Sequence, residues 1–248
     1  MRKLTFGATL ASVALGTQWV LRQRPSARVA PPEGPMEGEI ARAYAWQSSL
    51  PNFRLLYEWL AQRALVDAPA TGRALDIGCG PGGLVAELAR RAPTWEFVGL
   101  DASSEMLEAA AAKHGTLRGQ VQWQTGAAEQ LSFPDQSFDL VVSTLALHAL
   151  RDPLWCFNAI ARVLKPSGRF MLFDFRRDMV GGAWLTLWLA QHTPLVHEAI
   201  RDQDQPLASV RASYTPREVM ELAHKSQLPP WRIATGTFWL SLESAVSP

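Results

Sequence analysis

The sequence predicts an α/β fold, with a mostly parallel sheet covered by helices. An apolar run at Arg73–Ile77 is followed by a glycine-rich turn and by helical spacing from Leu84, which indicates strand, tight turn and helix. Phe138–Ser143 is almost continuously apolar, as a strand buried on both faces is. The chain has 248 residues and is 48% hydrophobic, so it can bury the core of one such domain.

The glycine turn is the first candidate binding site. Gly78, Gly80 and Gly82 lack Cβ atoms, so backbone N–H groups can lie directly against a ligand. Asp76 would repel the pyrophosphate of a dinucleotide, whereas it suits an ammonium group such as the methionine end of S-adenosylmethionine. The turn also contains a formal G-x-G-x-x-G ending at Gly83, a weak signal that keeps a dinucleotide site as the alternative.

A second strand, Trp95–Leu100, ends in another acid, Asp101. One carboxylate can accept hydrogen bonds from both hydroxyls of a ribose, so Asp101 is a candidate ribose ligand. This feature indicates an adenosine-type ligand and is shared by both cofactor classes.

Four motifs occur in order along the chain: L-D-I-G-C-G-P-G, G-L-D-A-S, F-P-D-Q-S-F-D-L-V-V-S and R-V-L-K-P-S-G-R-F. Together they resemble the class I S-adenosylmethionine-dependent methyltransferases, in the broad group that includes quinone-biosynthesis methyltransferases, over roughly residues 36 to 245. The resemblance implies a Rossmann-like, doubly wound sheet of seven strands, mostly parallel with an antiparallel last strand. It also implies N-terminal helices over the cofactor and an apolar insertion after the fifth strand.

The resemblance implies a set of cofactor contacts. These are Asp76, Gly78, Gly80 and Gly82 at the methionine end, Asp101 on the ribose and Ala128 near adenine. The family usually presents an Asp to the adenine amino group, and here Ala127 stands at that position. Adenine recognition is then left to backbone groups near Ala128 or to Glu129, which is equally well interpreted as a solvent-exposed charge.

His148 is the first candidate general base. It follows the Phe138–Ser143 strand, and ligands of parallel sheets bind beyond the carboxyl ends of strands. Histidine suits the role because its side chain titrates near neutral pH, although a lone histidine is more often structural. The family often has two consecutive histidines, and this chain has Ala149 in the second place. Asp174, at the end of the fifth strand, is the second candidate, with an ion pair to the neighbouring arginines as the alternative.

Two further regions have both a functional and a packing interpretation. Residues 36–66 suggest two helices separated near Pro51, whose aromatic residues either cover the cofactor or simply pack on the sheet; these are Tyr44, Trp46, Tyr57 and Trp59. Met179–Val196 is uncharged and either lines an acceptor pocket or membrane-facing entrance, or packs as plain core. Residues Asp202–Ser213 are expected to form a mobile polar loop.

We expect the chain to consist of two parts. Residues 1–35 are an apolar segment with a proline-rich linker, and residues 36–248 are a catalytic domain. Leu4–Leu21 is uncharged and barely long enough for a membrane span, so a cytoplasmic protein with membrane association through this segment is one expectation. The net charge of +1 disfavours a nucleic-acid partner. Cys79 and Cys156 lack metal-ligand spacing and are interpreted as reduced thiols, so no metal is expected.

We therefore expect a methyltransferase that uses S-adenosyl-L-methionine and moves a methyl group to a small, lipophilic acceptor by in-line displacement. The sequence leaves open whether oxygen, carbon or nitrogen is methylated, and which oligomer forms. Two alternatives remain at this point: a non-catalytic module that keeps the cofactor fold and binds a partner, and a nicotinamide-dependent oxidoreductase.

Overall fold

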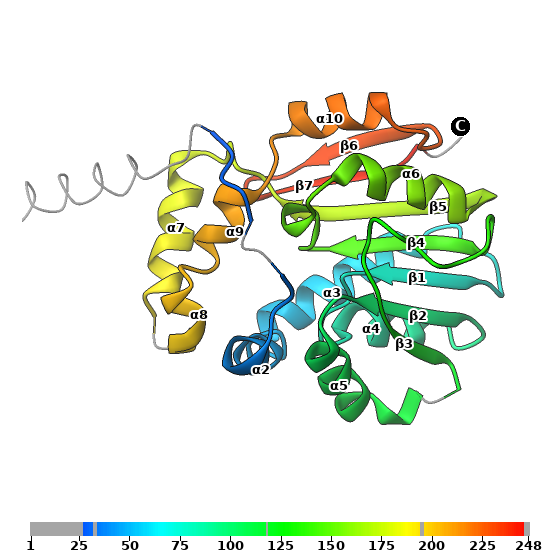
Figure 1. The fold of residues 1–248 in the computed structure, drawn as a ribbon, viewed down its shortest axis with the longest axis horizontal. Helices are drawn as coiled ribbons and strands as arrows, with labels where there is room; N and C mark the ends of the chain where they lie inside the picture. Colours follow the sequence, from blue (N-terminus) through cyan, green and yellow to red (C-terminus); the bar gives the residue numbers. More distant parts are fainter. Residues whose placement is uncertain (1–26, 32–33, 118, 194–195, 246–248) are drawn as a thin grey trace, which may run out of the picture.

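The computed structural model describes residues 27–31, 34–117, 119–193 and 196–245, and within them seven strands form one sheet in the order β3-β2-β1-β4-β5-β7-β6 (Figure 1). The strands are β1 (Arg73–Ile77), β2 (Glu96–Asp101), β3 (Val121–Thr125), β4 (Phe138–Thr144), β5 (Leu164–Phe175), β6 (Trp231–Thr235) and β7 (Trp239–Ser244). Neighbouring strands from β3 to β5 pair in parallel, and β7 is antiparallel to both β5 and β6. The expected doubly wound, mostly parallel sheet is confirmed.

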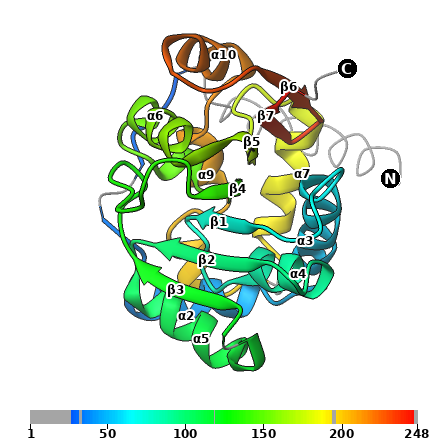
Figure 2. The ribbon, with the colours of Figure 1, turned by 90° about the vertical axis from the view of Figure 1, so that its right-hand side faces the viewer.

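Helices cover both faces of the sheet. They are α2 (Gly38–Gln47), α3 (Pro51–Ala64), α4 (Gly83–Arg91), α5 (Ser104–Lys113), α6 (Pro153–Val163), α7 (Gly181–Gln191), α8 (Glu198–Asp202), α9 (Leu207–Ala212) and α10 (Pro216–Lys225), with short 3₁₀ turns η1 (Gly115–Leu117) and η2 (Leu147–Ala149). Figure 2 shows α3 and α4 on one side of the sheet and α6 on the other. Two clusters of buried side chains fill the two sides, one including Leu60 of α3 and Leu84 of α4, the other Phe157 of α6 and Val219 of α10.

Side-chain caps begin several of the helices. The Ser103 hydroxyl accepts the Met106 N–H at the start of α5, and the Asp152 carboxylate accepts two N–H groups at the start of α6. Thr215 and Glu218 form a reciprocal capping box on α10. These caps satisfy N–H groups that have no partner within a helix, so the start of each helix is fixed by local sequence.

The start of β5 is irregular. Lys165–Gly168 contains a proline and a glycine, the composition of a turn, but β5 already begins at Leu164. Its pairing with β4 shifts from Phe138 opposite Leu164 to Leu140 opposite Arg169, so the intervening residues form an irregularity within the strand. The proline and glycine in this stretch suit a bulge as well as a turn, which explains the difference.

The expectation of a mobile polar loop at Asp202–Ser213 was wrong. Half of this stretch is α9, in which Leu207 and Val210 are 1% and 0% exposed. Both side chains pack with Met179 and Trp184 in a small core of their own beside the main sheet. The polar run Asp202–Gln205 precedes this helix, and the apolar residues three positions apart within the helix face the core.

The insertion α7–α9 and helix α2 lie beyond the carboxyl ends of β1 and β4 (Figure 1). Ala43 of α2 is buried against Val196 and Ile200, so the N-terminal helices and the insertion contact each other. Trp184 of α7 is fully buried, while Leu189 is 54% exposed. One side of the uncharged Met179–Val196 stretch is therefore core.

Leu4–Leu21, on which the expected membrane association rests, lies outside the described residues. Among the residues that are described, no helix has the length and apolar character needed to cross a membrane.

Candidate active site

Two acids stand at the carboxyl ends of the adjacent strands β1 and β2. The Asp101 carboxylate accepts the Gly80 N–H at 2.7 Å through Oδ2 and the Ser103 N–H at 2.9 Å through Oδ1. The glycine turn and the end of β2 are thus joined directly by hydrogen bonds. Each oxygen of Asp101 keeps a lone pair for a further donor, so the group is already oriented for a diol.

The glycines of the turn have the conformation that the sequence predicts. Gly78, Gly80 and Gly82 have φ of +69°, +51° and +77°. A Cβ on Gly78 would lie 2.5 Å from the Cβ of Ala146, and one on Gly82 would lie 2.5 Å from the Trp123 ring. The turn therefore requires glycine for two reasons, backbone conformation and close packing.

Asp76 is 3% exposed, and its Oδ1 has no hydrogen-bond partner among the described residues. Burial, and secondarily the charge of Asp101, raises the pKa of the Asp76 carboxyl well above its usual value. A buried carboxylate oxygen without a donor is unfavourable, and an ammonium group would satisfy it. The acid, the open glycine turn and the second acid at Asp101 fit the amino end and the ribose of S-adenosylmethionine.

The turn after β3 reaches the same edge. The Gly126 N–H donates to the Asp101 carbonyl at 3.0 Å, which fixes the turn beside the end of β2. Ala128 is 9% exposed and packs into the core, while Ala127 is exposed. Glu129 accepts the backbone N–H of Arg151 at 3.2 Å, so its carboxylate bridges two loops.

The two candidate catalytic residues are in direct contact. His148 Nδ1 lies 3.0 Å from both carboxylate oxygens of Asp174, and the His148 backbone N–H donates to Asp174 Oδ2 at 2.7 Å. Both residues are buried, at 8% and 1% exposure. Because the carboxylate accepts the Nδ1 proton, Nε2 of the neutral ring is left as an acceptor, and it has no partner among the described residues.

The ion pair proposed as the alternative for Asp174 does not form. Arg176 pairs with Asp178, and Arg177 donates to Glu218 at 2.6 Å and to the Ser213 carbonyl at 2.9 Å. Both arginines are therefore occupied elsewhere, and the partner of Asp174 is His148.

The loop that carries His148 is held at its start. Leu145 has φ of +55°, an unfavourable conformation for a branched side chain, and its N–H donates to the Phe173 carbonyl at 2.8 Å. Ser143 at the end of β4 donates to the Ile77 carbonyl at 2.7 Å, which fixes β4 against the cofactor strand. The turn into η2 is therefore fixed by bonds to both neighbouring strands.

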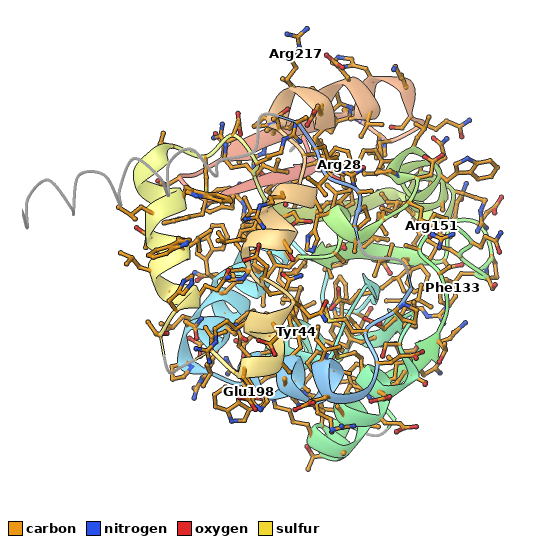
Figure 3. All side chains as sticks on the ribbon, turned by 60° about the vertical axis from the view of Figure 1, so that its left-hand side comes forward. Arg28, Tyr44, Phe133, Arg151, Glu198 and Arg217 are labelled. Atoms are coloured by element: carbon orange, nitrogen blue, oxygen red, sulfur yellow. The ribbon has the colours of Figure 1, made fainter. Side chains whose placement is uncertain are left out.

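Two tyrosines also reach the site, and the sequence alone did not distinguish them from packing residues. Tyr44 belongs to α2 and is labelled in Figure 3. Burial, followed by the charges of Asp101 and Asp174, raises the pKa of Tyr44 to about 12. Burial raises the pKa of Tyr57 as well, with smaller effects from Tyr44 and Asp76. Tyr44 thus lies near Asp101 beside the glycine turn and near Asp174 beside His148. The only signal in the sequence was their position in helices expected to cover the cofactor.

The other two aromatic residues of these helices behave as packing or surface residues. The ring centre of Trp59 lies 5.8 Å from that of Phe173 and 5.4 Å from that of Trp239, on the side of the sheet covered by α3. Trp46 is 50% exposed and lies edge-on to the ring of His197. The packing interpretation therefore holds for Trp59, whereas Trp46 lies at the surface and does not pack on the sheet.

The sheet order, the glycine turn and the two strand-end acids define an α/β enzyme that binds an adenosine-type cofactor with an ammonium group. Residues 75–172 match the family described as "Methyltransferase domain". Demethylmenaquinone methyltransferase of Deinococcus radiodurans is 30% identical over 178 residues, which are 71% of each chain. The chain belongs to the S-adenosylmethionine-dependent methyltransferases, and S-adenosylmethionine is its cofactor.

Other relatives match less of their length. Fatty-acid O-methyltransferase of Mycolicibacterium smegmatis is 33% identical over 121 residues, which are 49% of this chain and 42% of that one. Several further curated relatives are matched over less than two thirds of their length. A crystal structure from Methanococcus maripaludis, described as a candidate S-adenosylmethionine-dependent methyltransferase, covers 87% of this chain and 99% of its own with a TM-score of 0.65. It is 21% identical, so this likeness concerns the fold.

Proposed function

We propose that the enzyme methylates a small, apolar acceptor carrying a neutral group that loses a proton during the reaction, with His148 as the general base. The observation that carries this proposal is the contact of His148 Nδ1 with Asp174 at 3.0 Å, which leaves Nε2 free at the carboxyl edge of the sheet. A base is needed only where the acceptor must lose a proton. A buried histidine oriented by a carboxylate suits that task.

We further propose how the chain holds its cofactor. Asp76 receives the ammonium group, the backbone of Gly78, Gly80 and Gly82 approaches the methionine end, and Asp101 receives the ribose hydroxyls. Backbone groups near Ala128 contact adenine. When bound, S-adenosylmethionine supplies a methyl group on a positively charged sulfur. The protein then has to align the acceptor and exclude water, and effective molarity of this kind lowers a barrier by about 7–11 kcal/mol.

Asp174 has two tasks in this mechanism. Its bond to Nδ1 fixes the tautomer in which Nε2 accepts the acceptor's proton, and its charge then stabilises the protonated ring. Asp174 also accepts the backbone N–H of His148, and this second bond fixes the position of the backbone from which the ring projects. Positioned general bases contribute about 10²–10⁴-fold to rate, which is the effect assigned to this pair.

The charges around the site favour a neutral acceptor over a carboxylate. Asp76, Asp101 and Asp174 are all acids. The arginines that contact the neighbouring segments, Arg28 and Arg177, donate to backbone carbonyls or to Glu218. A carboxylate would therefore meet the negative charge of these acids, and neither Arg28 nor Arg177 is free to pair with it. Of the activities named for relatives, demethylmenaquinone methylation fits this balance better than fatty-acid O-methylation.

The insertion supports an apolar acceptor. Helix α7 carries no charged residue, and the partly buried side chains of Phe175, Trp188 and Phe238 surround its small core. Such a surface next to a polar cofactor site favours a molecule with an apolar body and one reactive polar group.

The proposal is tested by methyl transfer from labelled S-adenosylmethionine to two probes of similar length. One is a hydroquinone with an isoprenoid tail and the other is a saturated fatty acid. We expect methylation of the hydroquinone, and His148→Gln is expected to reduce kcat about 10²–10⁴-fold. Methylation of the fatty acid alone, or full activity of His148→Gln, would contradict the proposal.

Cofactor contacts are tested separately by calorimetry with S-adenosylhomocysteine. Asp101→Ala is expected to weaken binding about tenfold or more, because two hydrogen bonds to a charged group are lost. Asp135→Ala, which removes an exposed acid paired with Arg162, is the control and is expected to leave affinity unchanged. Equal affinity of Asp101→Ala and wild type would remove Asp101 from the ribose site.

A further inference from the structure

A short segment ahead of the N-terminal helices, Ala27–Val29, lies against the far side of the active-site loop; we call it the Arg28 strap. The Val29 N–H donates to the Arg211 carbonyl at 3.0 Å, which fixes the strap along α9. The strap precedes residue 36, where the resemblance to methyltransferases begins, and lies outside the matched residues 75–172.

Arg28, which is labelled in Figure 3, contacts two other parts of the chain, His148 and the segment Ala212–Tyr214. Its Nε donates to the Ala212 carbonyl at 2.6 Å, and its Nη2 donates to the His148 carbonyl at 3.1 Å. Its guanidinium carbon lies 4.2 Å above the centre of the Tyr214 ring. The flat, forked donor array of arginine is what allows one side chain to serve two carbonyls while it stacks on a ring.

The segment that Arg28 contacts needs support from both sides. It is a single 3₁₀ turn, η2, entered through Leu145 with its unfavourable φ of +55°. Its bonds to β5 run from Leu145 to Phe173 and from His148 to Asp174, and α9 packs against it. Arg28 adds a hydrogen bond from the strap at the carbonyl of the candidate base itself. A strained loop keeps one conformation only where its surroundings determine it.

We propose that Arg28 is a positioning residue: it holds the His148 segment in the orientation in which Nδ1 meets Asp174, and it couples that segment to the end of α9. The inference rests on the proposed function in one respect, since it matters for catalysis only if His148 is the base. The catalytic unit then starts at the strap rather than at residue 36, and the guanidinium group adds a hydrogen-bonded link to the direct packing of α9 against η2.

The test uses the full chain with isotope-labelled histidine and records the imidazole nitrogen signals, which report tautomer and mobility. The chain has 5 histidines, and comparison with His148→Gln assigns the signal of interest. In Arg28→Met we expect the His148 signals to shift or broaden while those of the other histidines stay unchanged. Arg28→Lys keeps the charge and loses the fork, so an intermediate change is expected. Arg54→Met, which removes an exposed arginine paired with Glu58, is the control.

Activity is measured on the same variants with the hydroquinone probe. We expect kcat of Arg28→Met to fall about 10- to 100-fold, as for a reacting group displaced by about 1 Å, with S-adenosylhomocysteine affinity retained. Retained affinity also reports that the variant is folded. If Arg28→Met does not fold, the same measurements are made on Arg28→Lys. Wild-type histidine signals in the folded variants would overturn the inference. Shifted signals together with full activity of His148→Gln would instead leave positioning intact and refute the proposed base.

Discussion

Asp174 holds His148 at two points, the backbone N–H at 2.7 Å and the ring Nδ1 at 3.0 Å. One carboxylate thus sets both where the residue sits and which ring nitrogen is left free. The two residues come from the ends of neighbouring strands, β4 and β5, so the sheet itself brings them together.

Asp174→Asn is expected to lower kcat with little change in cofactor affinity. The amide can still accept one hydrogen bond, but it no longer stabilises a protonated imidazole, so a loss of about 10²-fold or more is expected. Steady-state kinetics with the hydroquinone probe and calorimetry with S-adenosylhomocysteine separate the two effects. A variant with wild-type kcat would show that the carboxylate only holds the loop.

Asp76→Asn is expected to weaken S-adenosylhomocysteine binding about 10- to 100-fold, the effect of losing a hydrogen bond to a charged group of about 1.5–3 kcal/mol. Isothermal calorimetry measures it directly. Asn keeps the shape of the side chain and removes the charge, so an unchanged affinity would mean that the ammonium group is bound elsewhere.

The same substitution is expected to stabilise the free protein near neutral pH. Burial and the charge of Asp101 raise the pKa of the Asp76 carboxyl in the folded protein. The protonated carboxyl therefore makes its full contribution to the free energy of unfolding at pH values below the pKa of the unfolded chain. This contribution is lost as pH rises through the pKa of the folded protein. Wild type therefore carries the unfavourable buried charge above that value, and Asp76→Asn does not. Thermal unfolding should give a higher Tm for the variant near neutral pH, with a difference that shrinks towards acid. A lower Tm at neutral pH would contradict the assigned burial effect.

Binding of S-adenosylhomocysteine is expected to release protons over the pH range in which free Asp76 titrates. The ammonium group favours the charged carboxylate, so affinity should increase with pH through the raised pKa of the free protein. Calorimetry in two buffers of different ionisation enthalpy counts the protons. The release should disappear in Asp76→Asn, and its persistence there would assign the proton to another group.

Gly78→Ala is expected to impair both folding and cofactor binding. The added Cβ would lie 2.5 Å from that of Ala146, at a residue with φ of +69°. Gly182→Ala is the matched control, because nothing lies within 4 Å of its Cβ position and it is in the first turn of α7. Replacing a helical glycine by alanine changes stability by about 1 kcal/mol or less. Thermal unfolding of the two variants should therefore differ clearly, and equal Tm values would contradict the packing described.

The part of the site around the glycine turn and Asp101 could largely be predicted from sequence, because the residue patterns that indicate it are local. Asp76 and the glycines adjoin one strand end, and positive φ with close packing restricts such positions to glycine. The helix caps at Ser103 and Thr215 are equally local. Their outcome depends on a few neighbouring residues and on strand polarity, both of which are visible in the chain.

The part of the site around His148 and Asp174 was predicted less well, because its contacts join residues that are far apart in the sequence. The His148–Asp174 contact joins residues 26 positions apart, and the sequence offered neighbouring arginines as closer partners. The contact of Arg28 with His148 spans 120 positions and comes from a stretch without a motif. Helix α9 follows the polar run Asp202–Gln205 in the chain, and this run led to the interpretation of the whole stretch as a loop.

The division of the chain has a consequence for how new activities arise on this scaffold. The matched residues 75–172 contain the glycine turn and His148, whereas α7, α8 and α9 lie between β5 and α10, beyond that range. Exchange of the insertion would therefore leave the glycine turn and the two strand-end acids unaltered, whereas the contacts of the Arg28 strap and of α2 with the insertion would change with it. A laboratory graft of residues 179–213 between related enzymes would make this exchange.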